Sequence, residues 1–192
     1  ADSEGKVYAW GTNREIINVV TQEDPMITGG WLGIDFREGT GFHEQLQPTL
    51  VSGFAEADQV VKVICGKYHS LALTAAKKMK SWGGNLNGQL GYGQIADGVH
   101  EPTQISLALS DVIVSWVDVV PGEVHSVALD DTGRCFAWGA TDQGQSGVDK
   151  IQYQTTPILV PLRGSAISIG ASKQSSFAVF ANGTAYSWGS NN

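Results

Sequence analysis

The chain has 192 residues and carries 12 lysines and arginines against 19 aspartates and glutamates, a formal net charge of −7. That balance argues against nucleic-acid binding driven by phosphate neutralisation, which needs a basic surface. Hydrophobic residues make up 42% of the chain, enough to exclude disorder by composition, and 24 glycines favour many tight turns over long helices.

Neither a membrane span nor a disulfide framework is visible in the sequence. No apolar run approaches the roughly 20 residues of a membrane-spanning helix. The two cysteines, Cys65 and Cys135, lie inside apolar strand-like runs, so we predict two buried free thiols. Unpaired thiols weakly favour a reducing compartment, and we expect an intracellular protein, cytoplasmic or nuclear.

The first expected element is a strand that ends at Trp10-Gly11, after a turn at Gly5. Residues 14–47 then lengthen the distance to the next Trp-Gly pair to 72 residues, against 56 and 50 later in the chain. Long loops are uncommon and often functional, and aromatic and arginine side chains such as Trp31 and Arg37 suit an interface anchor. We interpret 14–47 as a long inter-repeat insertion that is either a surface excursion or a partner-binding arm.

Three longer units follow, and they agree with one another in register. Each has an alternating, strand-prone segment that begins 13 residues before a tryptophan. The three segments are His69-Ser70-Leu71-Ala72-Leu73, His125-Ser126-Val127-Ala128-Leu129 and Ser175-Ser176-Phe177-Ala178-Val179, which precede Trp82, Trp138 and Trp188. A turn glycine stands five residues before the tryptophan, except that Lys77 takes this place in the first unit. Each unit is therefore predicted to form a β-hairpin within a small antiparallel sheet of three or four strands.

Glycines complete the motif. Gly66 and Gly122 each stand three residues before a histidine, and a glycine-rich run at 88–93 follows the first unit, before Glu101-Pro102-Thr103. Together these residues resemble the repeat of the regulator of chromosome condensation family. The resemblance implies an all-β fold, a seven-bladed β-propeller. Residues 1–192 are then expected to form a single partial propeller of about three to four blades, with the missing blades supplied by the rest of the chain or by another subunit.

The resemblance also implies roles for individual residues. Structural repeat positions are Gly66, His69, Trp82, Gly122, His125, Trp138 and Trp188. The residues directly after the repeat glycine lie, in this family, on a face that several members use for partners. In this sequence they are Lys67, Tyr68, Glu123, Val124, Lys173 and Gln174.

Little in the sequence points to catalysis. His69 and His125 occupy the same repeat position, no histidine pair has zinc-ligand spacing, and neither cysteine lies in a Cys-x-x-Cys motif. The glycine-rich run precedes no helix that could bind a phosphate, and Asp130-Asp131 is expected to be a solvated turn. We therefore predict no catalytic residues, no metal and no cofactor.

Three functions remain open. The first is a non-catalytic module that docks a protein partner through its loops. The second is a guanine nucleotide exchange factor for a small GTPase, which would bind the nucleotide-free state better than the bound one and needs no bond-making residue. The third, implied by another member of the family, is a proteinaceous enzyme inhibitor.

Overall fold

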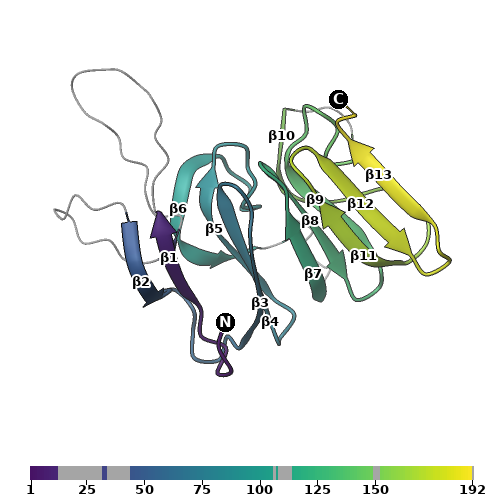
Figure 1. The fold of residues 1–192 in the computed structure, drawn as a ribbon. Coiled ribbons are helices and arrows are strands. Elements are labelled where there is room, and N and C mark those ends of the chain that lie inside the picture. Colours follow the sequence, from purple (N-terminus) through teal and green to yellow (C-terminus); the bar gives the residue numbers. More distant parts are fainter. Residues whose placement is uncertain (13–31, 34–43, 106, 108–113, 149–151, 192) are drawn as a thin grey trace, which may run out of the picture.

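The computed structural model describes residues 1–12, 32–33, 44–105, 107, 114–148 and 152–191 (Figure 1). The described residues form thirteen β-strands in four antiparallel sheets. The first sheet pairs β1 (Tyr8–Thr12) with β2 (Glu44–Leu50). The second and third have four strands each, and the last has three. Within these ranges no helix has the length and apolar content needed to cross a bilayer.

Strand order follows chain order in every sheet. The second sheet runs β3 (Val60–Cys65), β4 (His69–Thr74), β5 (Met79–Asn85) and β6 (Ala96–Gln104). The third runs β7 (Trp116–Pro121), β8 (His125–Asp130), β9 (Cys135–Ala140) and β10 (Tyr153–Leu159). The last runs β11 (Ala166–Ala171), β12 (Ser175–Phe180) and β13 (Ala185–Gly189). This confirms the predicted sheets of three or four strands.

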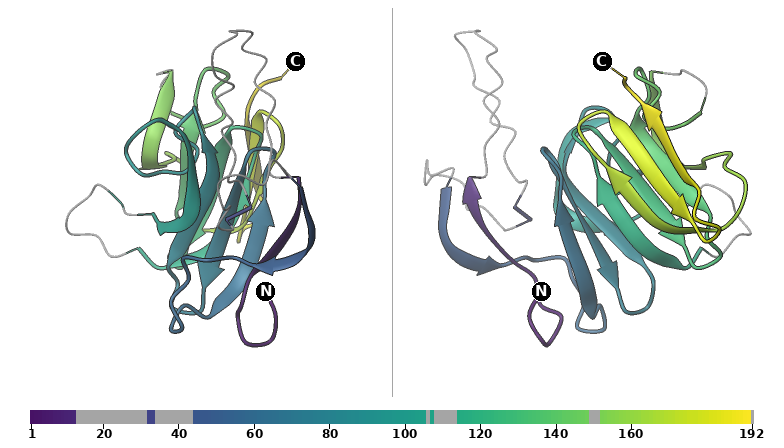
Figure 2. Two further views of the ribbon diagram at one scale, coloured as in Figure 1. Left: turned by 90° about the vertical axis from the view of Figure 1, so that its left-hand side faces the viewer. Right: turned by 45° about the vertical axis from the view of Figure 1, so that its right-hand side comes forward.

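The sheets stand side by side along an arc, as two further views show (Figure 2). Strand β7 contacts both β3 and β11, so the first strand of each sheet lies toward the inside of the arc. Strands β6 and β10 close the outer edge of their sheets. This arrangement of successive four-stranded sheets is that of neighbouring propeller blades.

The Trp-Gly pair has the same backbone conformation in all four sheets. The φ angles of Gly11, Gly83, Gly139 and Gly189 lie between 102° and 107°, a region that side chains disfavour. At Gly139 an added Cβ would also lie 2.6 Å from the Val124 carbonyl oxygen. Positive φ therefore favours glycine after all four tryptophans, and a close backbone approach adds to this at Gly83, Gly139 and Gly189.

The hydrophobic core is divided into layers between consecutive sheets. One layer packs Leu71, Leu73 and Met79 of the second sheet against Val119 and Phe136 of the third. Two further layers lie between the third and last sheets and between the first and second. The second and third sheets therefore bury both faces against their neighbours, as propeller blades do, whereas the first and last sheets each bury one face.

Three predictions need correction or refinement. Cys65 is exposed, because it ends β3 where the chain leaves the sheet, whereas Cys135 is buried; both are free thiols. Asp130 is buried and not solvated. Most of the predicted insertion 14–47 lies outside the described residues. A Cβ added at Gly33 would lie 2.9 Å from Trp82 Nε1, as one added at Gly91 would lie 2.9 Å from Trp138 Nε1, so Gly33 matches a repeat position.

Candidate functional site

Three short loops, which join the first two strands of the second, third and last sheets, carry the predicted partner-binding residues. Each loop is anchored by one equivalent backbone hydrogen bond. The carbonyl oxygens of Tyr68, Val124 and Gln174 accept from the amides two residues after the tryptophan, at Gly84, Ala140 and Ser190, over 2.7–2.9 Å. The loops are thereby held at fixed positions on successive sheets.

Charged side chains connect the three loops. The Lys67 ammonium donates to Glu123 Oε1 at 2.5 Å, and Lys173 Nζ lies 3.7 Å from Glu123 Oε2. The Glu123 amide donates to the Lys173 carbonyl oxygen at 3.2 Å. We call Lys67, Glu123 and Lys173 the loop row. One carboxylate thus connects loops of three consecutive sheets.

The loop row has a positive outer surface. The Glu123 side chain is largely covered, whereas both lysine side chains are exposed. The hydrogen bond from Lys67 lowers the pKa of Glu123, and the same bond raises the pKa of Lys67. The Lys67 ammonium also lies 4.6 Å from the centre of the Tyr68 ring, at cation–π distance. An otherwise acidic chain therefore presents two ammonium groups that share one largely covered carboxylate.

Beneath the loops, buried histidines join neighbouring sheets. His69 Nε2 lies 2.9 Å from Ser126 Oγ, and this hydroxyl donates to the Gln89 carbonyl oxygen at 3.0 Å. Because the serine proton is already donated, His69 must be the donor in the first bond, which fixes its proton on Nε2. His125, Ser176 and the Gln145 carbonyl repeat the arrangement between the third and last sheets.

Both histidine rings are buried and uncharged. Burial lowers the pKa of His69 to about 3 and that of His125 to about 4, so both rings are neutral near pH 7. Neither ring is open to solvent, so neither can transfer a proton to a bound molecule. Gly122 leaves room for the His125 ring, which a Cβ at that position would contact. Gly66 lies in the same way beside His69.

The tryptophans contribute to the same links. Trp138 Nε1 donates to the Gln89 carbonyl oxygen at 2.8 Å, and Trp188 Nε1 to that of Gln145 at 3.0 Å. Trp82 and Trp138 are 2% and 0% exposed, but Trp10 is 60% exposed, because no described sheet precedes β1. Each carbonyl therefore accepts from two residues of the following sheet.

The structure brings six of the eight predicted partner-binding residues onto adjoining loops. The other two, Trp31 and Arg37, lie outside the described residues. In the described ranges no three His, Cys, Asp or Glu side chains gather where they could hold a metal ion. The six residues on these loops present charged, aromatic and amide side chains side by side on successive sheets.

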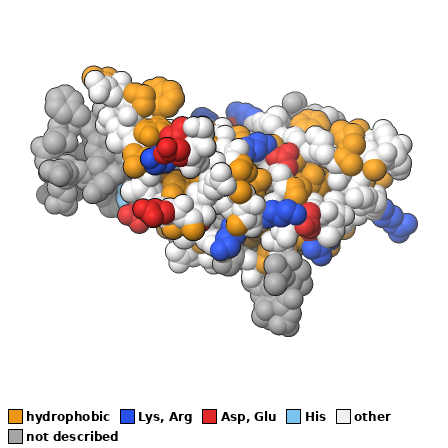
Figure 3. Space-filling model, turned by 90° about the horizontal axis from the view of Figure 1, so that it is seen from below, with side chains coloured by type: hydrophobic (Ala, Val, Ile, Leu, Met, Phe, Trp, Pro, Cys, Tyr) orange, Lys and Arg blue, Asp and Glu red, His pale blue; other side chains and the backbone are white. Residues whose placement is uncertain are grey.

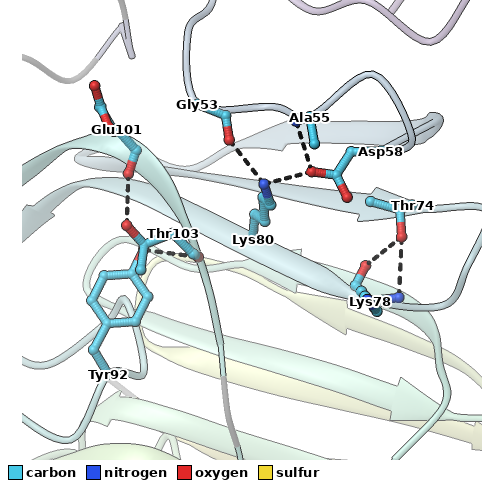
Figure 4. Close-up of polar contacts among 9 residues, drawn as sticks. All are labelled: Gly53, Ala55, Asp58, Thr74, Lys78, Lys80, Tyr92, Glu101 and Thr103. Atoms are coloured by element: carbon cyan, nitrogen blue, oxygen red, sulfur yellow. Dashed lines mark hydrogen bonds and ion pairs between the residues drawn. The ribbon is translucent and has the colours of Figure 1, made fainter.

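A largely covered lysine, Lys80, was missed at the sequence level. Lys80 Nζ donates to Asp58 Oδ2 at 2.6 Å and to the Gly53 carbonyl oxygen at 2.8 Å (Figure 4). Its ammonium also lies 5.1 Å from the Phe54 ring. Lys80 therefore fixes the segment that leads into β3. Lys80 stands two residues before Trp82, and the equivalent residue of the next unit is Phe136. A lysine in place of an aromatic residue is the feature of the sequence that could have indicated this contact.

The opposite edge of the sheets has a different character. The hairpin turns lie there, and Lys77 Nζ contacts Asp131 Oδ2 at 2.9 Å between two of them. Seen from below, this face carries acidic and basic side chains in mixture (Figure 3). The loop row and the hairpin turns thus offer two distinct surfaces at opposite ends of the strands.

Comparison with known proteins supports the repeat assignment. The model of the regulator of chromosome condensation (RCC1) repeat matches residues 60–89 and 81–129. Protein pim1 of Schizosaccharomyces pombe is 30% identical over 98% of this chain, which spans 34% of pim1. The human probable E3 ubiquitin-protein ligase HERC6 is 36% identical over 67% of the chain, which spans 13% of that protein. The chain thus spans about a third or less of these relatives.

A solved structure agrees in fold over nearly the whole chain. Yeast RCC1 (Prp20), determined bound to Kap60, superposes with a TM-score of 0.77 at 27% identity, covering 98% of this chain and 40% of that one. The matched repeats, the four equivalent Trp-Gly turns and the layered cores all lead to one assignment. The chain belongs to the RCC1-like β-propeller repeat family.

Proposed function

We propose that the chain is a non-catalytic interaction module that docks a protein partner through the loop row and the adjoining residues Tyr68, Val124 and Gln174. The observation that carries this proposal is the shared carboxylate of Glu123, which pairs with exposed lysines on the loops of the two neighbouring sheets. Recognition needs a surface whose parts keep fixed relative positions, because ordering them on binding costs free energy. The anchored loops meet that need.

The remainder of the ring is part of the same proposal. Trp10 on the first sheet and Phe177 on the last are exposed where equivalent side chains are buried. We propose that further blades, from the rest of the polypeptide or from another subunit, cover both positions. We also propose an intracellular protein, because Cys65 and Cys135 are free thiols.

A photo-crosslinking experiment tests the docking surface. A photoreactive phenylalanine analogue replaces Tyr68 in the loops or, as the control, Thr132 in a hairpin turn at the opposite edge. In extract of the source cells we expect one discrete crosslinked protein from position 68 and none from position 132. The double variant Lys67→Glu, Lys173→Glu should abolish the crosslink and keep the circular dichroism spectrum, because exposed ion pairs contribute only about 0–1 kcal/mol to stability. Equal crosslinking from both edges would refute the proposal.

Exchange activity is the second candidate. Its support is the similarity of fold to yeast RCC1 (Prp20) over 98% of this chain. Resemblance to this family implies an exchange activity. The test is release of a fluorescent GDP analogue from a small nuclear GTPase. Release accelerated at least tenfold by this chain would favour exchange activity, and an unchanged rate would favour docking alone. Enzyme inhibition stays a prediction, because none of the described contacts bears on it.

A further inference from the structure

The loop between β5 and β6 carries two exposed aliphatic residues. Leu86 and Ile95 are 43% and 46% exposed. They flank the last residue pair of the two strands, Asn85 with Ala96, and the Asn85 side chain donates to the Gln94 carbonyl oxygen at 3.0 Å. The two aliphatic residues therefore leave neighbouring strands at the same end of the second sheet.

That end of the sheet also carries Lys67 and Tyr68. The Gly84 amide donates to the Tyr68 carbonyl oxygen at 2.7 Å, and Leu86 follows Gly84 by two residues. The Lys67 ammonium lies 4.6 Å from the centre of the Tyr68 ring. We call Tyr68, Leu86 and Ile95 the apolar patch. An exposed ammonium group therefore borders this patch.

The third sheet differs at both equivalent positions. It has Glu123 in place of Lys67 and Asp142 in place of Leu86. Asp142 is also exposed, although the third sheet packs against a described sheet on each of its faces. Exposure at this position is therefore a property of the repeat and does not result from a missing neighbour.

The charges on this face favour an acidic group over the second sheet. A lysine ammonium has three N–H donors, and Glu123 Oε1 accepts from that of Lys67 at 2.5 Å, which leaves donors for a further carboxylate. Over the third sheet, the Asp142 carboxylate accepts from the side-chain amides of Gln143 and Gln145 and would repel an acidic group. The second sheet alone therefore offers a cation beside aliphatic surface.

We infer that Lys67 and the apolar patch bind a segment of the partner protein in which an acidic residue stands beside an aliphatic one. The carboxylate of this segment accepts from the Lys67 ammonium, and the aliphatic side chain packs on Leu86 and Ile95. Burial of apolar surface supplies affinity, and the complementary charges supply selectivity. This inference rests on the proposed docking function, to which it adds the chemistry of the partner.

Labelled synthetic peptides test the inference by fluorescence polarisation with the 192-residue protein. The probe peptide contains Ser-Glu-Glu-Leu-Leu-Ser. Two matched peptides replace Glu-Glu by Lys-Lys, or Leu-Leu by Ser-Ser. We expect the probe to bind about tenfold more tightly than either, because each matched peptide loses one half of the contact. Equal affinities of the three peptides, or no binding of the probe, would overturn the inference.

Protein variants locate the contact. Lys67→Glu should reverse the preference between the acidic and the basic peptide. Lys62→Glu is its control, because Lys62 also pairs with an acidic residue of the third sheet, Asp118, but lies within β3 and outside the loops; it should keep the preference. Leu86→Ser should weaken binding of the probe about fivefold, whereas Val61→Ser, at an exposed aliphatic residue of β3, should leave it unchanged. An unaltered preference in Lys67→Glu would contradict the proposed contact.

Failure of this inference is distinguishable from failure of the docking proposal. If the crosslink from position 68 persists while the peptides show no preference, a partner docks through other chemistry, and this inference alone is overturned. Loss of both results would overturn the two together. A protein that sediments as a dimer, and that Lys67→Glu converts to a monomer, would show that a second copy occupies the apolar patch and would equally overturn the inference.

Discussion

Lys77 occupies a backbone conformation that glycine holds in the equivalent turns. Its φ is 58°, and Gly5, Gly133 and Gly183 have φ between 79° and 84°. Among the described residues it is the single non-glycine with positive φ. A left-handed conformation costs a residue with a Cβ about 1–2 kcal/mol. The ion pair between Lys77 and Asp131 offsets part of this cost, but both side chains are well exposed and such pairs contribute about 0–1 kcal/mol.

Lys77→Gly should therefore stabilise the protein. We expect the free energy of unfolding to rise by about 0.5–1 kcal/mol, because relief of backbone strain exceeds the loss of the exposed ion pair. Urea denaturation measures the change, and Lys77→Ala, which also loses the ion pair but keeps a Cβ, is the control. A variant less stable than the parent would mean that the ion pair dominates.

Gly122 is constrained by space and not by φ, since it is absent from the positive-φ residues. A Cβ there would contact the His125 ring and lie 2.7 Å from the Ser172 carbonyl oxygen. Gly122→Val should lower the free energy of unfolding by about 2–4 kcal/mol through overpacking. Gly170→Ala, whose Cβ meets nothing closer than 3.6 Å, should change it by less than about 1 kcal/mol. Equal effects in thermal denaturation would contradict this account of the site.

At the scale of the strand, the link between sheets depends on neutral histidines. His69 of β4 reaches Ser126 of β8, and His125 of β8 reaches Ser176 of β12. In the last sheet Ser175 occupies the position of these histidines. Its hydroxyl donates to the Ser190 carbonyl oxygen of its own sheet. The last sheet therefore has no equivalent link to offer a following blade.

The histidine links predict a dependence of stability on pH. Burial lowers the pKa of both histidines below the ordinary value of 6.5, so below pH 6.5 the unfolded chain takes up protons that the folded chain does not. The free energy of unfolding should fall by about 2 kcal/mol per histidine between pH 7 and pH 5, and be unaffected by these groups above pH 7. Urea midpoints at the two pH values measure this. The control variant, His100→Gln at an exposed histidine, should keep the same drop, and a stability that is flat over this range would contradict the prediction.

Strands were more predictable than the side chains that hold them in place. Alternating residues before Trp82, Trp138 and Trp188 indicate hairpins because the period of two is a local property. Asp130 was misjudged, because its burial depends on the turn closing around it. Its carboxylate accepts from the amides of Thr132 and Arg134 and pairs with the Arg134 side chain. Lys80 and Asp58 are 22 residues apart, and no periodic pattern predicts a contact of that kind.

At the scale of the molecule, the two ends of the arc differ from its interior. Trp10 and Trp138 hold the same repeat position, yet one is 60% exposed and the other fully buried. The family resemblance fixed a register that assigns Lys67, Glu123 and Lys173 to equivalent loops, and their role in binding a partner stays a prediction. The sequence did not predict that two lysines share Glu123, because this contact depends on the distance between neighbouring sheets.

The same substitution at these two tryptophans should have unequal effects. Trp138→Ala should lower the free energy of unfolding by about 3–5 kcal/mol, because it leaves a cavity between two sheets and removes the bond to the Gln89 carbonyl. Trp10→Ala should lower it by less than about 1 kcal/mol. Chemical denaturation followed by circular dichroism suits both variants, and equal losses would mean that β1 is covered in solution.

In the part of the chain that the structure describes, the side chains that donate to the carbonyl oxygens of Gln89 and Gln145 come later in the chain, in the following sheet. This gives assembly a direction during synthesis. As the polypeptide leaves the ribosome, these carbonyl oxygens of one blade have no protein donor until the next blade has emerged. The hydrogen bonds from the next blade then hold the two blades together. At any moment only the newest blade would need protection by a chaperone, and a stall in translation would expose one face of one sheet.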